Sequence, residues 1–173
     1  MPDLRNGEGN MLTYQDQGTD IVIVFSTAAL DRFARNRQLH PSSAEAGGQL
    51  FATFDSAVAH IELATGPRPT DHRSRYRFQP DRWAEQLEIK TMFRQGLHYV
   101  GDWHTHPTQA PLPSSEDLRN IRAVVRKSLH QLTGFVLVVV GNAPFPRGLS
   151  VTVDTGKDAL RLQVATASTT CVV

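Results

Sequence analysis

Residues 99–117 constrain this chain more than any other stretch of its sequence. Apolar and polar residues alternate at the start of the stretch, which predicts a strand, and Pro107 ends that strand. His104 and His106 lie two residues apart on it, so their side chains leave the same face of a sheet. After a proline-rich loop, Asp117 lies at the start of a segment with helical periodicity. The stretch therefore predicts that two imidazoles and one carboxylate meet across a single loop.

The size and charge of the chain favour one globular domain that does not bind nucleic acid. With 173 residues and 40% hydrophobic content, the chain can bury one ordinary core and is too short for two. Its 18 basic and 17 acidic residues give a net charge of +1, and the basic residues are scattered. Arginines are densest at 68–82, where a solvated loop is the simpler interpretation and an acidic protein partner is the alternative.

The cysteine content and the apolar runs predict a cytoplasmic protein with no membrane segment. The single Cys171 excludes an internal disulfide framework and a multi-cysteine zinc ribbon, and we assign it no role. Residues 1–20 contain no apolar core of a signal peptide. The longest aliphatic or aromatic run, 135–140, is too short to cross a bilayer.

Strands and helices are interleaved along most of the chain, which predicts a mixed α/β or α+β sandwich rather than a doubly wound nucleotide-binding fold. We divide the chain into a flexible lead-in at 1–19, a domain at 20–165 and a tail at 166–173. Strands are expected at 21–25, 45–54, 57–64, 76–78, 97–106, 135–140, 149–153 and 160–164. Helices are expected at 27–39, at 80–94 and from 114 towards 134.

The apolar residues of the last two helices predict which of their faces is buried. Pro80 and Asp81 suit the first turn of the earlier helix, and Gly96 suits its end. The residues of that helix expected to face the core are Trp83, Leu87, Met92 and Phe93. The later helix carries a regular apolar stripe formed by Leu118, Ile121, Val125 and Leu129.

His104, His106 and Asp117 form a candidate catalytic metal site. Such a site needs three protein ligands and one open position, and nitrogen and carboxylate donors suit Zn²⁺. A histidine pair at this spacing is a weak signal alone, but a serine and an aspartate at fixed distances after it make coincidence far rarer. The remaining histidines have no partner at metal-ligand spacing and are expected to be exposed or structural: His40, His60, His72, His98 and His130. One Zn²⁺ ion is the expected cofactor.

Hydrolysis at such an ion also needs a base, which takes a proton as water attacks and later returns it to the leaving amine. Glu45 is the candidate, because it lies at a predicted strand start and is followed within three residues by two glycines. Glycines there would let backbone and substrate approach closely.

Two interpretations stay open for Ser114. The spacing Ser114-x-x-Asp117 is that of a helix capping box, which accounts for both residues without a metal. Alternatively, Ser114 donates a hydrogen bond to the oxyanion that forms on attack. The two roles are compatible, because Asp117 lies one turn before Ile121 and so points towards the packed side of its helix. Asp102 is likewise either a residue that orients a ligand imidazole or a solvated carboxylate, while Trp103 is expected in the core.

These residues together resemble the motif of the JAB/MPN metalloproteases, also called JAMM. The motif is an upstream glutamate, His-x-His-Pro, five residues, Pro-Ser, two residues and aspartate. This chain matches it at Glu45, His104, His106, Pro107, Pro113, Ser114 and Asp117. The order of the expected elements agrees with the family from about residue 21 to 153. The resemblance implies a cytidine-deaminase-like α/β fold, a mixed β-sheet flanked by about three helices.

The resemblance also implies what each residue of the motif does. By position, His104, His106 and Asp117 would bind one zinc ion, Glu45 would be the general acid/base, and Ser114 would stabilise the oxyanion. The implied reaction is hydrolysis of a peptide or isopeptide bond after the C-terminus of ubiquitin or a ubiquitin-like protein.

A finer resemblance is to bacterial JAB peptidases encoded beside ubiquitin-like activating and conjugating enzymes in cyclic-nucleotide-based antiphage systems. It rests on two stretches, 66–74 and 101–107. It implies cleavage of a conjugate between the C-terminus of a nucleotide cyclase and its target, with the activating and conjugating enzymes as further partners. Two alternatives remain: a peptidase for a sulfur-carrier protein and a catalytically silent MPN scaffold.

Overall fold

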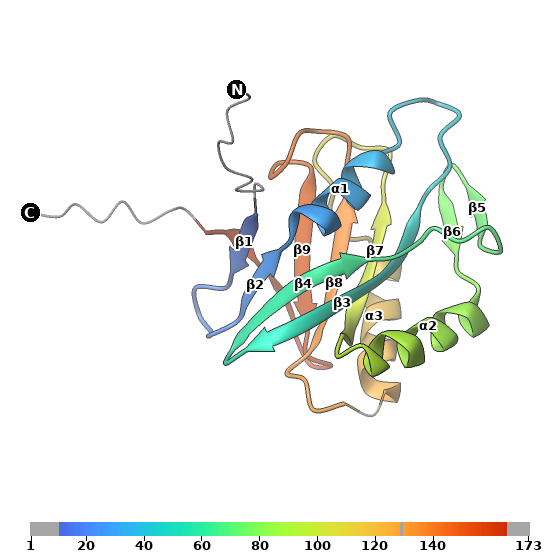
Figure 1. The fold of residues 1–173 in the computed structure, drawn as a ribbon. Helices are drawn as coiled ribbons and strands as arrows, with labels where there is room; N and C mark the ends of the chain where they lie inside the picture. Colours follow the sequence, from blue (N-terminus) through green and yellow to red (C-terminus); the bar gives the residue numbers. More distant parts are fainter. Residues whose placement is uncertain (1–10, 129, 166–173) are drawn as a thin grey trace, which may run out of the picture.

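The computed structural model describes residues 11–128 and 130–165. Within them, one curved sheet has the strand order β10-β9-β8-β7-β3-β4-β2-β1-β11, and β5 and β6 form a separate hairpin (Figure 1). The strands of the sheet are β1 (Leu12–Gln15), β2 (Val22–Phe25), β3 (Gly47–Asp55), β4 (Val58–Ala64), β7 (His98–Thr105), β8 (Phe135–Val140), β9 (Leu149–Asp154), β10 (Ala159–Arg161) and β11 (Gln163–Val164). The hairpin and helices are β5 (His72–Ser74), β6 (Arg77–Gln79), α1 (Thr27–Arg35), α2 (Arg82–Arg94) and α3 (Ser115–Lys127). The predicted mixed sheet with three helices is confirmed.

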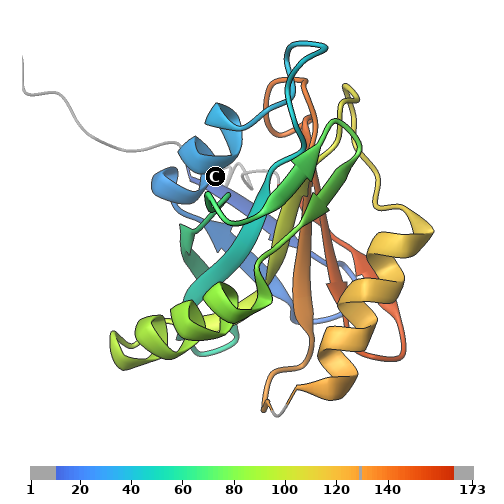
Figure 2. The same cartoon turned by 90° about the vertical axis from the view of Figure 1, so that its right-hand side faces the viewer.

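The sheet separates α1 from α3, which lie on opposite faces in Figure 2. Ser26 caps α1 by accepting a hydrogen bond from the amide of Ala29 at 3.1 Å, and Phe33 packs into the core on that face. On the other face, Ile121 and Val125 of α3 pack against alternate residues of β8. Because β8 is covered on both faces, all six of its residues are buried, as its continuous apolar sequence predicts.

The pairing of β7 with its neighbours determines what meets at its end. β7 runs antiparallel to β3, with His104 opposite Gly47, and parallel to β8. The register between β3 and β7 shifts next to Gly101, which has φ of +149°. A Cβ atom at Gly101 would collide with the carbonyl oxygen of Val136, so this irregular position requires glycine. Beyond it, His104 faces the side of the sheet that carries α3.

Trp103 points to the opposite face and anchors the core, as predicted. It is 1% exposed, and its ring packs against Phe33 with 5.2 Å between the ring centroids. Its Nε1 atom donates a hydrogen bond to the carbonyl oxygen of Thr65 at 2.8 Å. The indole therefore buries a large apolar surface without an unpaired donor.

The edges of the sheet differ from the sequence prediction. The sequence predicts Leu12–Gln15 within the flexible lead-in, but these residues form β1, which pairs with β2 and β11. Tyr14 of β1 is 3% exposed, so tertiary packing orders a segment whose local composition is polar. The strand expected at 160–164 is two short strands around the buried Leu162. Residues 1–10 and the tail at 166–173 lie outside the described residues.

In α2, three of the four residues predicted to face the core are exposed, and the fourth, Met92, is half-buried. Trp83, Leu87 and Phe93 are 75%, 51% and 64% exposed, whereas Glu85 is 4% exposed. The polar surroundings of α2 explain this, because Glu85 lines the same cleft as Asp102 of β7, and Glu88 shares Arg68 with Gln49 of β3. The helix meets them with acidic side chains: Glu85 pairs with Arg82, and Glu88 pairs with Arg68.

The helix ends also shift. α1 ends at Arg35 rather than near residue 39, because the amide of Asn36 already closes the helix by donating to Phe33. α3 ends at Lys127, and Leu129 lies outside the described residues. In the described part of the chain, no helix combines the length and the hydropathy required to cross a membrane.

Candidate metal centre

The end of β7 and the start of α3 bring the predicted ligands together. The Nε2 atoms of His104 and His106 lie 3.2 Å apart. Asp117, in the first turn of α3, places Oδ1 3.3 Å from Nε2 of His104 and Oδ2 3.5 Å from Nε2 of His106. Two nitrogen donors and a carboxylate thus point at one another across the loop, as the sequence predicts.

Glu45 approaches the same point from the segment before β3. One of its carboxylate oxygens lies within 4.8 Å of ring nitrogens of both His104 and His106. Its backbone is fixed by β5, since its amide donates to the carbonyl of Ser74 and its carbonyl accepts from Nε of Arg73, both at 2.7 Å. The β5 strand, which the sequence did not predict, therefore holds the candidate base in place.

The electrostatics agree with a metal-binding cluster. Burial raises the pKa of Glu45, and the two nearby imidazoles partly oppose that shift. Burial also acts to raise the pKa of Asp117, but hydrogen bonds from His104 and His106 outweigh it and leave the pKa below its ordinary value. The hydrogen bond to Asp117 in turn raises the pKa of His106. An ionised carboxylate among partly buried nitrogen donors suits a divalent cation such as Zn²⁺.

Ser114 is the N-cap of α3, which confirms the capping interpretation. Its Oγ atom accepts from the amide of Asp117 at 3.1 Å, and its own amide donates to Oδ2 of Asp117 at 2.7 Å. The Ser114 hydroxyl hydrogen is not used in this cap and remains free to donate. The cap therefore leaves open the second role considered for Ser114, as a donor to an oxyanion.

A cleft of about 110 Å³ leads away from the cluster between α2 and α3. Beyond Glu45, His104 and Asp117, its polar wall includes Glu85 and Asp102. Asp102 accepts a hydrogen bond from the Tyr99 hydroxyl at 2.9 Å. Sequence reasoning missed Glu85, because a glutamate in an amphipathic helix gives no signal that it faces inward.

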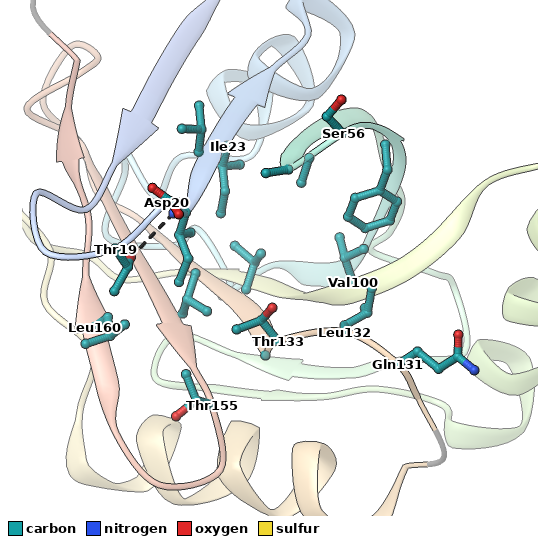
Figure 3. Close-up of a pocket in the computed structure, with 18 residues that line it drawn as sticks. Thr19, Asp20, Ile23, Ser56, Val100, Gln131, Leu132, Thr133, Thr155 and Leu160 are labelled. Atoms are coloured by element: carbon teal, nitrogen blue, oxygen red, sulfur yellow. Dashed lines mark hydrogen bonds between the residues drawn. The ribbon is translucent and has the colours of Figure 1, made fainter.

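A larger cavity lies elsewhere, at the opposite end of the sheet (Figure 3). It measures about 480 Å³ and is lined mainly by apolar side chains, including Ile23, Val100 and Leu132. Asp20 is the only charged residue among those lining it. Because catalysis by hydrolysis needs convergent polar groups, the smaller cleft at the histidines is the candidate reaction site.

Comparison with known proteins identifies the family. The family described as prokaryotic homologs of the JAB domain matches residues 26–153, which span every residue of the cluster. The chain belongs to the prokaryotic JAB family. The predicted resemblance is confirmed, and so is the prediction of an enzyme of the JAB metalloprotease class.

Named relatives within this JAB family include isopeptidases. A "CD-NTase/cGAS isopeptidase" of Enterobacter hormaechei is 30% identical over 136 residues, covering 77% of this chain and 74% of the relative. A protein of the same name from Vibrio cholerae is 28% identical, and the match covers 78% of this chain and 85% of the relative. A "Probable metalloprotease" of Sinorhizobium fredii is 37% identical, and the match covers 58% of this chain and 64% of the relative.

A solved structure shares the JAB-family fold of this chain. It is a protein of Desulfitobacterium hafniense with a TM-score of 0.56 and 21% identity, and the match covers 79% of this chain and 87% of that protein. This likeness concerns the fold alone. The assignment of the metal cluster rests on the geometry described above.

Proposed function

We propose that this chain is a zinc-dependent isopeptidase that hydrolyses the bond after the C-terminus of a conjugated nucleotide cyclase or a ubiquitin-like protein. In a cell it would act as a deconjugating enzyme of an antiphage system. The observation that carries the proposal is the convergence of Glu45, His104, His106 and Asp117 beside one cleft. The names of the relatives from Enterobacter and Vibrio support the cyclase conjugate as the substrate.

In the proposed reaction, His104, His106 and Asp117 would hold the zinc ion. Bound there, Zn²⁺ would supply Lewis acidity and bring the pKa of water towards neutrality. Glu45 takes the proton of the attacking water and delivers it to the leaving amine. Burial prepares Glu45 for this task, because a raised pKa makes a carboxylate both a better base and a competent acid near neutral pH.

Ser114 is proposed to donate its free hydroxyl hydrogen to the substrate carbonyl oxygen as negative charge develops there. Its place at the N-terminus of α3 favours this role, since the backbone amides of a helix start also stabilise negative charge. Ser114 is exposed, so a substrate entering from solvent can reach it.

Exposed apolar side chains near the cleft fit a protein substrate better than a small metabolite. Trp83 follows directly on Arg82, which lines the cleft, and Leu112 lies in the loop that carries the chain from the histidines to α3. They are 75% and 57% exposed. We include these two side chains in the proposed contact surface for a protein substrate.

The alternatives differ in specific ways. A catalytically silent scaffold lacks a ligand or the glutamate, whereas this chain has all of them in one cluster. A sulfur-carrier peptidase would use the same chemistry on a different tail. The substrate panel must therefore include a cyclase C-terminal fusion, a ubiquitin-like fusion and a sulfur-carrier fusion.

The test combines metal analysis with cleavage of that panel. The wild-type protein is expected to bind one zinc ion per chain and to cleave the cyclase or ubiquitin-like fusion, and a chelator should abolish cleavage. Glu45→Gln should keep the zinc and lose at least 100-fold in kcat, as removal of a general base predicts. The control is Glu116→Gln, at an exposed position in the first turn of α3, and this variant should cleave at the wild-type rate. Full activity of Glu45→Gln would overturn the mechanism.

A further inference from the structure

Thr105 lies between the two histidines but points away from them. Thr105 is 0% exposed, and its side chain lies on the face of the sheet that α1 covers, as does that of Trp103. There its Oγ1 atom accepts a hydrogen bond from the amide of Ala46 at 2.9 Å and donates one to Oε1 of Gln38 at 2.9 Å. Ala46 directly follows Glu45, so Thr105 links the histidine strand to the chain that carries the candidate base.

Gln38 continues this link on the other side of Glu45. It is 2% exposed, and its Nε2 atom donates to the carbonyl oxygens of Ser43 at 3.2 Å and Arg75 at 2.8 Å. The backbone carbonyl oxygen of Gln38 accepts a hydrogen bond from the side-chain amide of Asn142 at 2.9 Å. Gln38 thus ties together the end of α1, the segment before Glu45 and the turn of the β5–β6 hairpin.

The direction of every hydrogen bond in this chain of contacts is determined. Two carbonyl oxygens lie beside one end of the Gln38 amide, so that end must be the NH₂ group and the other must be the oxygen. The hydroxyl of Thr105 must therefore donate to Gln38, which leaves its lone pairs to accept from Ala46. A side chain of the same shape without a hydroxyl cannot replace Thr105.

We propose that Thr105 and Gln38 are positioning residues that fix the backbone on both sides of Glu45 and so set the distance of its carboxylate from His104 and His106. Neither touches the reacting atoms. The contact at Ser43 holds the chain two residues before Glu45, and the contact at Ala46 holds it one residue after. The Thr105 amide adds a bond to the Ala46 carbonyl at 2.8 Å. The inference rests on the proposed function only in what it says of catalysis.

The expected kinetic effect follows from the geometric demands of proton transfer. A displacement of about 1 Å in a catalytic group can reduce the rate by roughly 100-fold. Thr105→Val keeps the volume and removes both hydrogen bonds, so kcat should fall by about 10- to 100-fold with KM within about twofold of the wild type. Thr105→Ser restores the hydroxyl and should restore kcat. Zinc content should be equal in all three proteins.

A second measurement needs no turnover. Hydrogen exchange followed by NMR should show the Ala46 amide exchanging at least about tenfold faster in Thr105→Val than in the wild type, and at the wild-type rate in Thr105→Ser. Gln38→Leu should lower kcat by a similar factor, and the double variant should lose no more than the larger single loss, because both residues act through one chain of contacts.

The matched control is Thr65→Val. Thr65 is a buried threonine whose hydroxyl donates to Glu88 of α2 at 2.7 Å rather than to the backbone beside Glu45, so removing that hydroxyl should lower thermal stability without changing kcat. An equal loss of kcat in Thr65→Val, or unchanged Ala46 exchange in Thr105→Val, would overturn the inference. If the wild-type protein cleaves none of the fusions, the proposed function fails, and the Ala46 exchange rate alone decides whether Thr105 holds this segment.

Discussion

Ser114 and Asp117 exchange two hydrogen bonds at the start of α3, each backbone amide donating to the side chain of the other residue. The Asp117 carboxylate faces both imidazoles at the same time. The helix cap and the candidate metal centre therefore share their residues. Formation of α3 orients Asp117 towards the proposed ion. Most substitutions at Ser114 would therefore change both the stability of the helix and the rate of catalysis.

Ser114→Gly separates them. Glycine at an N-cap costs only a few tenths of a kcal/mol relative to serine, but it has no hydroxyl to donate. We expect the free energy of unfolding to stay within about 0.5 kcal/mol of wild type and kcat to fall by roughly 100-fold. Ser114→Thr keeps the cap and the hydroxyl and should retain activity. Chemical denaturation and steady-state kinetics measure the two effects, and normal kcat in Ser114→Gly would remove Ser114 from catalysis.

Zinc binding should stabilise the folded chain measurably. A ligand that binds only the native state at 100 times its Kd adds about 2.7 kcal/mol, which for a domain of this size corresponds to a rise in Tm of at least about 5 °C. A chelator should reverse the rise, and His106→Gln should abolish it. His40→Gln, at an exposed histidine that is not one of the proposed ligands, should show the same rise in Tm as the wild type. A shift that survives in His106→Gln would place the ion elsewhere.

Local signals in the sequence predicted much of this fold. Ser26 before an apolar-periodic segment predicted a helix start, and it caps α1. The continuous apolar run at 135–140 predicted a strand buried on both faces, and β8 is such a strand. In each case the residues that decide the structure are neighbours in the chain.

The sequence predictions fail where contacts with a segment distant in the chain determine the local structure. The orientation of α2 depends on polar partners from other segments, Asp102 near Glu85 and Arg68 on Glu88, and the sequence of α2 alone does not indicate them. At the site, Glu45 reaches the histidines because β3 pairs with β7 at Gly47 and His104. The motif pattern located these residues, but the support from Arg73 and from Gln38 depends on tertiary contacts that one sequence does not encode locally.

The two tryptophans should respond oppositely to substitution. Trp83 is 75% exposed, so Trp83→Ala should change the free energy of unfolding by less than about 0.5 kcal/mol. Trp103→Phe loses a buried hydrogen bond and leaves a cavity, with an expected cost of about 2 kcal/mol. Acrylamide should quench the fluorescence of Trp103→Phe, which retains only Trp83, far more than that of Trp83→Phe. Equal quenching would contradict the outward orientation of α2.

The inward orientation of Glu85 predicts that stability falls as pH rises. Burial, together with the nearby Asp102 carboxylate, raises the pKa of Glu85 from 4.5 to about 7, against the opposing effect of Arg82. Between these values the folded chain holds a proton that the unfolded chain has lost. The stabilisation from this proton is complete below about pH 4.5 and is lost as pH rises through about 7, with a magnitude of up to roughly 3 kcal/mol.

Glu85→Gln removes the titrating group while keeping the size of the side chain. Its free energy of unfolding should therefore fall less between pH 5 and pH 8 than that of the wild type, and the two curves should diverge most above pH 7. Urea denaturation at several pH values measures this difference. Glu116→Gln, an exposed substitution, should follow the wild-type curve. Parallel curves for Glu85→Gln and the wild type would show that Glu85 is ionised in the folded chain and that α2 does not bury a neutral carboxyl against Asp102.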